Sequence, residues 1–140
     1  MQDRIEYNKF LANIKEKIQS SQYEAFKKVN SELISLYWDI GSMISEKQNI
    51  HGWGKSVVEQ LSKDLQNSYP GIRGFSARNI WRMRRFYEEY KQSEFLPPLV
   101  AEISWSHNIV ILEKCNDLLE REFYIKTAKK FGWTKITLNY

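Results

Sequence analysis

The chain has 140 residues, of which 42% are hydrophobic and 14% aromatic, and its formal net charge is +4. A chain of this length can bury roughly 68–70% of its unfolded surface, so it can fold as one domain over residues 1–140 without a disulfide or a structural metal. The apolar content argues against disorder, and a single cysteine excludes an internal disulfide. The sequence contains neither a signal peptide nor a run of about 18 apolar residues, so we expect a cytoplasmic protein that does not enter the membrane.

Residues 1–50 are predicted to form a long helical N-terminal segment of two helices. Apolar residues recur at three- and four-residue steps over residues 7–18, and Ser20 and Ser21 interrupt this pattern. A second helix is expected over residues 23–46, and Gly41 inside it indicates a kink or a close helix contact. The inward-facing stripe of the second helix is predicted to be Phe26, Val29, Leu33, Tyr37, Ile40 and Ile44.

Residues 55–91 are predicted to form a helix-turn-helix-like unit, with a winged helix as the related alternative. Its first helix covers residues 55–68 and ends at Pro70-Gly71. Ser76 is a good N-cap for the second helix, residues 77–90, with Ile80, Met83, Tyr87 and Tyr90 on its buried face. The connection between the two helices is longer than the three or four residues of a tight helix-turn-helix.

The region after the apparent linker at residues 92–98 is predicted to hold the C-terminal helices, within residues 99–140. Ser104 or Ser106 can cap a helix that runs to about Cys115. The spacing of Asp117 and Glu120 resembles a capping box and opens a helix that ends near Phe131, before Gly132. The predicted fold class is therefore mainly α, a multi-helix domain.

The positive charge is concentrated in residues 71–91. Six basic residues stand against Glu88 and Glu89 there, which gives six minus two, or the whole net charge of +4. A local cationic surface on a neutral body is typical of a polyanion-binding protein. The basic residues are Arg73, Arg78, Arg82, Arg84, Arg85 and Lys91.

Arg78, Arg82 and Arg85 fall within about 60° of one another on the helix 77–90. Arginine suits phosphate oxygens and guanine edges because its planar fork donates two hydrogen bonds at once. The helix also has a cation in its first turn and acids in its last turn, against its macrodipole, which hints at function. The DNA-binding residues expected from this pattern are Arg73, Ser76, Arg78, Asn79, Arg82, Arg84 and Arg85. The alternative is an ordinary solvated helix face.

No catalytic residue, cofactor or metal site is predicted. His51 and His107 have no metal-ligand partner at usable spacing, and Asp39 and Glu102 are isolated carboxylates. Cys115 is expected to be a buried, inert thiol. The five tryptophans are more typical of a core than of a ligand platform.

Several strings resemble a known bacterial family. They are LYWDIG at residues 36–41, GWG at residues 52–54 with VVEQLS at residues 57–62, GFSARNIWRMR at residues 74–84, SWSH at residues 104–107 and EREFY at residues 120–124. In this order they resemble the N-terminal domain of YhcG-like proteins, which usually precedes a PDDEXK nuclease domain. The resemblance implies that the nuclease centre lies further on, and no such domain is present in residues 1–140. A fragment, a truncated gene and a frameshifted remnant all stay open as explanations.

Two functions follow as alternatives. The first is a DNA-binding or targeting module of a YhcG-like nuclease that has no catalysis of its own and binds double-stranded DNA. The second is an interaction module, in which the long N-terminal helix pairs with a copy of itself, as a homo-oligomer, or with the nuclease domain. Salt-dependent DNA affinity would favour the first, and a stable dimer indifferent to DNA the second.

Overall fold

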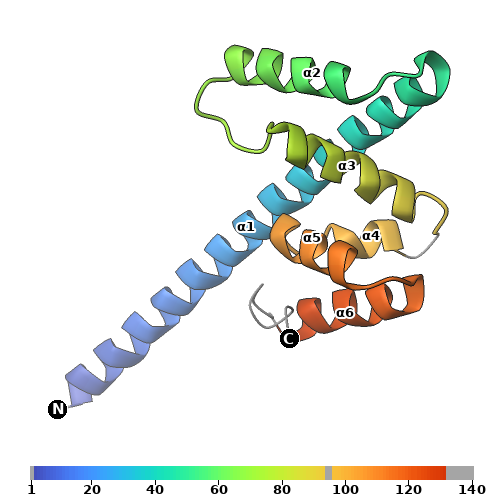
Figure 1. Ribbon diagram of the computed structural model, residues 1–140. Coiled ribbons are helices and arrows are strands. Elements are labelled where there is room, and N and C mark those ends of the chain that lie inside the picture. Colours follow the sequence, from blue (N-terminus) through green and yellow to red (C-terminus); the bar gives the residue numbers. More distant parts are fainter. Residues whose placement is uncertain (1, 94–95, 132–140) are drawn as a thin grey trace.

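The computed structural model describes residues 2–93 and 96–131, which form six helices and no strand (Figure 1). The mainly α prediction is confirmed, and the wing of a winged helix has no counterpart among the described residues. None of the described helices is long and apolar enough to cross a membrane. The helices are α1 (Gln2–His51), α2 (Lys55–Ser68), α3 (Ala77–Tyr90), α4 (Leu96–Val100), α5 (Trp105–Lys114) and α6 (Leu118–Phe131).

Helix α1 is continuous from Gln2 to His51, so the predicted break at Ser20 and Ser21 is wrong. Both serines are exposed, and an exposed serine costs a helix only a few tenths of a kcal/mol. At 1.5 Å per residue the helix is about 75 Å long. Its N-terminal half extends away from the other helices as an arm (Figure 1).

The face of α1 that packs on the body differs from the predicted stripe. Its buried residues are Ile34, Tyr37, Gly41 and Ser45, and only Tyr37 was predicted. The expected close contact at Gly41 is confirmed, because a Cβ built there would collide with the main-chain carbonyl of Met83 on α3.

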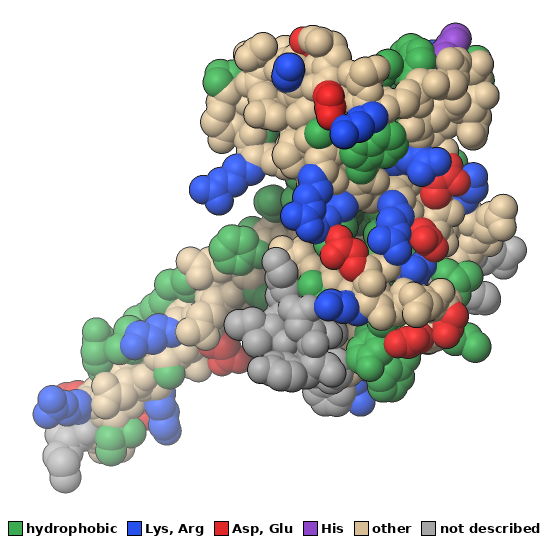
Figure 2. Space-filling model, viewed as in Figure 1, with side chains coloured by type: hydrophobic (Ala, Val, Ile, Leu, Met, Phe, Trp, Pro, Cys, Tyr) green, Lys and Arg blue, Asp and Glu red, His purple; other side chains and the backbone are tan. Residues whose placement is uncertain are grey.

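A second apolar face of α1 points into solvent. Figure 2 shows hydrophobic side chains along the arm. We call this face the outer stripe. It consists of Tyr7, Phe10, Ile14, Ile18, Phe26, Val29, Leu33 and Leu36, all of which are exposed.

Helix α3 lies at the centre of the fold, between α1 and α5 (Figure 1). Phe86 and Tyr90 on α3 are fully buried, as are Leu112 on α5 and Ile125 on α6. The rings of Trp38 and Trp105 both meet Phe86 edge to face, at centroid distances of 5.5 and 5.1 Å. Such aromatic pairs stabilise a core beyond the area they bury.

Two predicted helix starts are confirmed. The Ser104 hydroxyl accepts the main-chain N–H of His107 at 3.1 Å and caps α5. The Asp117 carboxylate accepts the N–H of Glu120 at 2.8 Å at the start of α6. The predicted C-cap Gly132 and the segment that follows it lie outside the described residues.

Candidate nucleic-acid interface

The loop that leads into α3 is fixed by short-range polar contacts. Ser62 on α2 donates its hydroxyl to the Phe75 carbonyl at 2.7 Å. Gly74 adopts a φ of 106°, which a residue with a side chain rarely takes, and it packs against the Tyr37 hydroxyl of α1. Ser76 then caps α3 by accepting the N–H of Asn79 at 3.2 Å, as predicted. The corner between α2 and α3 therefore has a defined shape.

Arg73 and Arg78 lie exposed at this corner, and neither has an ion-pair partner among the described residues. Arg73 belongs to the loop and Arg78 to the first turn of α3. Ser76 is exposed, and its hydroxyl accepts the main-chain N–H of Asn79. The main-chain N–H groups of Ala77 and Arg78, in the first turn of the helix, have no intrahelical partner. Two cations and the positive end of a helix are thus presented together to solvent.

The two arginines further along α3 are engaged within the protein. Arg82 forms an ion pair with Glu113 of α5 at 3.0 Å and is half-buried. Arg85 donates to the Leu112 carbonyl at 3.2 Å and approaches Glu89 at 3.5 Å. Because both guanidinium groups are already bonded to residues of α5 or α3, the predicted basic face is only partly available to bind a ligand from solvent.

Asn79 and Arg84 occupy more enclosed positions than the sequence indicated. Asn79 donates to the Gly74 carbonyl at 2.7 Å and accepts the Trp105 indole N–H at 2.8 Å, so its amide holds the loop and α5. Arg84 is half-buried, and its Nε has no hydrogen-bond partner.

Figure 2 shows Lys and Arg side chains interspersed with Asp and Glu over the middle of the body. The mixture agrees with the ion pairs of Arg82 and Arg85. Among the arginines of residues 71–91, the exposed ones without an ion pair in the described part of the chain, Arg73 and Arg78, lie at the corner of α2 and α3.

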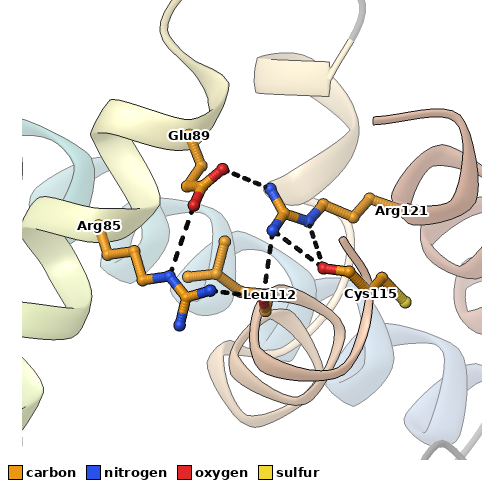
Figure 3. Close-up of polar contacts among 5 residues, drawn as sticks. All are labelled: Arg85, Glu89, Leu112, Cys115 and Arg121. Atoms are coloured by element: carbon orange, nitrogen blue, oxygen red, sulfur yellow. Dashed lines mark hydrogen bonds and ion pairs between the residues drawn. The ribbon is translucent and has the colours of Figure 1, made fainter. Parts of the chain in front are cut away.

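The acids in the last turn of α3 have a structural explanation. Glu88 accepts the Ser45 hydroxyl of α1 and pairs with Lys91 at 2.9 Å. Glu89 accepts a hydrogen bond from Arg121 of α6 at 2.8 Å (Figure 3). These contacts connect α3 to α1 and α6, so the two acids in the last turn are explained by tertiary packing, whereas Arg78 in the first turn is not.

Arg121 is the key residue that sequence reasoning missed. It is only 3% exposed, and its guanidinium donates to the carbonyls of Cys115 and Leu112 at 3.0–3.2 Å as well as to Glu89 (Figure 3). The signal that could have found it was the pair Glu88 and Glu89, unfavourably placed for the helix dipole and therefore in need of a cation from elsewhere.

The surroundings of Arg121 shift three pKa values. The Arg121 hydrogen bond lowers the pKa of Glu89 below its ordinary value. Burial raises the pKa of Tyr90 to about 12 and that of the Cys115 thiol to about 11. A buried thiol with a raised pKa is a poor nucleophile, which agrees with the predicted inert role of Cys115.

The described residues hold no group of three or more His, Cys, Asp or Glu side chains that could bind a metal ion. His107 contacts the capping residue Ser104, with 2.6 Å between Nδ1 and the hydroxyl oxygen. His51 stacks on Trp53, an exposed tryptophan outside the core.

A family model for the DUF1016 N-terminal domain matches residues 13–140. The chain belongs to this family. The match covers nearly the whole chain and confirms the resemblance on which the YhcG-like assignment rested. No solved structure matches the chain.

Among curated proteins, this DUF1016 N-terminal domain is similar to the protein named "Putative nuclease YhcG" of Escherichia coli (strain K12). The two are 31% identical over 91 residues, which cover 62% of this chain and 24% of the relative. The matched part is thus about a quarter of the relative's length.

Proposed function

We propose that this DUF1016 N-terminal domain is the DNA-targeting module of a YhcG-like nuclease, with its contact surface at the corner of α2 and α3. The observation that carries the proposal is the pair of exposed, unpaired arginines, Arg73 and Arg78, beside the free amides of the α3 N-terminus. Cations next to a helix N-terminus favour phosphate oxygens through charge and hydrogen bonding together. The α2–α3 pair is the helix-turn-helix-like unit of this proposal.

The other predicted DNA-binding residues take different roles in the proposal. Ser76 caps α3 and leaves the N–H groups of its first turn available to a phosphate, and Asn79 fixes the preceding loop through its hydrogen bond to the Gly74 carbonyl. Arg82 and Arg85 can bind DNA phosphates only if they give up their ion pairs with Glu113 and Glu89, respectively. We therefore expect a small footprint of about two phosphates at first contact, with Arg82, Arg84 and Arg85 adding to it only on close docking.

Salt titration of duplex DNA binding tests this proposal. Two neutralised phosphates give a slope of log affinity against log salt of about −1.8, and the double variant Arg73→Ala, Arg78→Ala should lose nearly all of it. The matched control is Arg4→Ala with Lys9→Ala, which removes two exposed cations from the arm of α1. Unchanged affinity and slope in the corner variant, or no binding to several duplexes at low salt, contradicts the proposal.

We further propose that the domain does not cleave DNA by itself, because phosphodiester hydrolysis with a metal ion needs a cluster of acidic ligands. The test is incubation of the purified chain with plasmid and magnesium or manganese. Cleavage that a chelator abolishes, and that purification does not remove, would contradict this.

A second function, a protein-interaction module, is favoured by the exposed outer stripe of α1. Long helices in proteins owe most of their stability to packing of an apolar face, and this one faces solvent over its N-terminal half. The test is binding of the chain to the separately expressed nuclease domain of a YhcG-like relative. Binding that Ile18→Glu abolishes and Ile5→Glu does not would support it.

A further inference from the structure

The outer stripe of α1 presents an unusually large apolar surface. Its eight residues are between 36% and 73% exposed. At roughly 150–200 Å² of accessible surface per large side chain, these fractions amount to about 650–850 Å² per chain. A standard stable interface buries about 800 Å² on each partner, so the stripe alone is large enough to form one.

The spacing of the stripe is nearly symmetric about the midpoint between Ser21 and Gln22. Tyr7 and Leu36, Phe10 and Leu33, and Ile14 and Val29 lie at equal distances on either side of this point, and Ile18 and Phe26 depart from equal distances by one residue. The polar segment at residues 19–22, Gln-Ser-Ser-Gln, lies close to this midpoint. A helix with this pattern matches a copy of itself running in the opposite direction, because apolar positions then meet apolar positions and Ser21 of one copy meets Gln22 of the other.

The outer stripe and the body-facing residues lie on different sides of α1. At 100° per residue, the stripe is centred more than 100° away from the face formed by Ile34, Tyr37, Gly41 and Ser45. A second helix can therefore lie along the stripe without displacing α3.

A groove beside the stripe marks where the second helix would lie. It has a volume of about 810 Å³ and runs between residues 23–33 of α1 and residues 98–104. In an antiparallel pair centred between Ser21 and Gln22, residues 10–20 of the second copy lie opposite residues 23–33. Phe10, Ile14 and Ile18 would then meet Leu33, Val29 and Phe26.

We propose that the occupant of this groove is the N-terminal half of α1 from a second copy of the chain, in an antiparallel homodimer centred between Ser21 and Gln22. The inference rests on the second function proposed above, because it names the partner of the interaction module. Two contact regions related by a twofold axis would bury the outer stripes of both chains at once.

The first test is the solution mass, measured by sedimentation over roughly 1–200 µM, a range that brackets the micromolar affinities of modest interfaces. Wild type should sediment as a dimer, at twice 16.8 kDa. Ile18→Glu should be monomeric, since it places a charge in the interface twice. Ile5→Glu is the matched control, because Ile5 is 54% exposed against 51% for Ile18 but lies off the stripe, and it should stay dimeric. Circular dichroism should show an unchanged fold in both variants.

The second test fixes the direction of pairing. In a Cys115→Ala background, a mixture of Ile18→Cys and Phe26→Cys chains of different mass should oxidise mainly to the mixed disulfide. Disulfides between two Ile18→Cys chains would instead indicate parallel pairing and overturn the antiparallel arrangement. A monomeric wild type at all concentrations overturns self-pairing altogether, and the interaction-module function then depends only on binding to the nuclease domain.

Discussion

Glu89 at the end of α3 and Arg121 near the start of α6 are joined by an ion pair of 2.8 Å. The same guanidinium satisfies the carbonyl of Cys115, which ends α5, and the carbonyl of Leu112 within α5. One buried arginine thereby connects α3, α5 and α6. Since an unpaired buried polar group is costly, this connection should dominate the polar contribution to stability.

Replacing Arg121 tests that role. Arg121→Met keeps much of the aliphatic volume but leaves the Cys115 carbonyl without its donor and Glu89 without its Arg121 hydrogen bond, while Arg85 still donates to the Leu112 carbonyl. The free energy of unfolding should therefore fall by about 2–4 kcal/mol. Arg85→Met is the matched control, because Arg85 contacts the same carboxylate from a largely exposed position and its loss should cost under about 1 kcal/mol. Denaturant unfolding measures both. Equal effects of the two substitutions would show that burial of Arg121 is unimportant.

The stability should depend on pH through Glu89. Arg121, with Arg85 beyond it, lowers the folded-state pKa of Glu89 below the ordinary 4.5. The folded protein then holds this proton less readily than the unfolded chain, so the stabilisation is complete above about pH 5 and is lost as pH falls through the folded pKa. The difference in melting temperature between wild type and Glu89→Gln should shrink from pH 6 to pH 3. A constant difference over that range would contradict the assignment.

Gly41→Ala should destabilise the fold although alanine favours a helix by about 1 kcal/mol over glycine. The added methyl group would collide with the Met83 carbonyl, and forcing α1 away from α3 should cost about 1–3 kcal/mol net. Ser35→Ala, at an exposed position of the same helix, should be neutral or slightly stabilising. Thermal unfolding monitored by circular dichroism distinguishes the two. A stabilised Gly41→Ala variant would mean that α1 and α3 do not approach this closely.

The Cys115 thiol should react slowly with disulfide reagents in the folded protein. Its pKa is raised from 9.0 to about 11, which lowers the thiolate fraction at pH 8 by about a hundredfold. Burial to 4% exposure should slow the reaction further. Labelling followed by absorbance should become fast once denaturant unfolds the chain. Fast labelling of the native protein would place the thiol at the surface.

Much of the local structure could be predicted from the sequence, because it depends on residues a few positions apart. Ser76, Ser104 and Asp117 each accept a hydrogen bond from a main-chain N–H three residues later, so their capping roles were readable. The buried positions of Ile80 and Met83 followed from helical spacing, although the fully buried Phe86 was missed. The motifs in residues 36–124 were likewise sufficient to identify the family.

Other features depend on which helix packs against which. Two apolar stripes run along α1, and periodicity cannot tell that the one with Tyr37 meets α3 while the one with Phe26 stays exposed. The pairing of Arg82 with Glu113 and of Arg121 with Glu89 joins residues 31 and 32 positions apart. Charge interactions of this kind have no local signature, because a carboxylate satisfies an arginine from any element that brings it within about 4 Å. The sequence by itself therefore determined most of the helices, three of their caps and the family, although it missed the continuity of α1 and the short helix α4. The tertiary structure decided which arginines of α3 and its preceding loop form ion pairs within the fold.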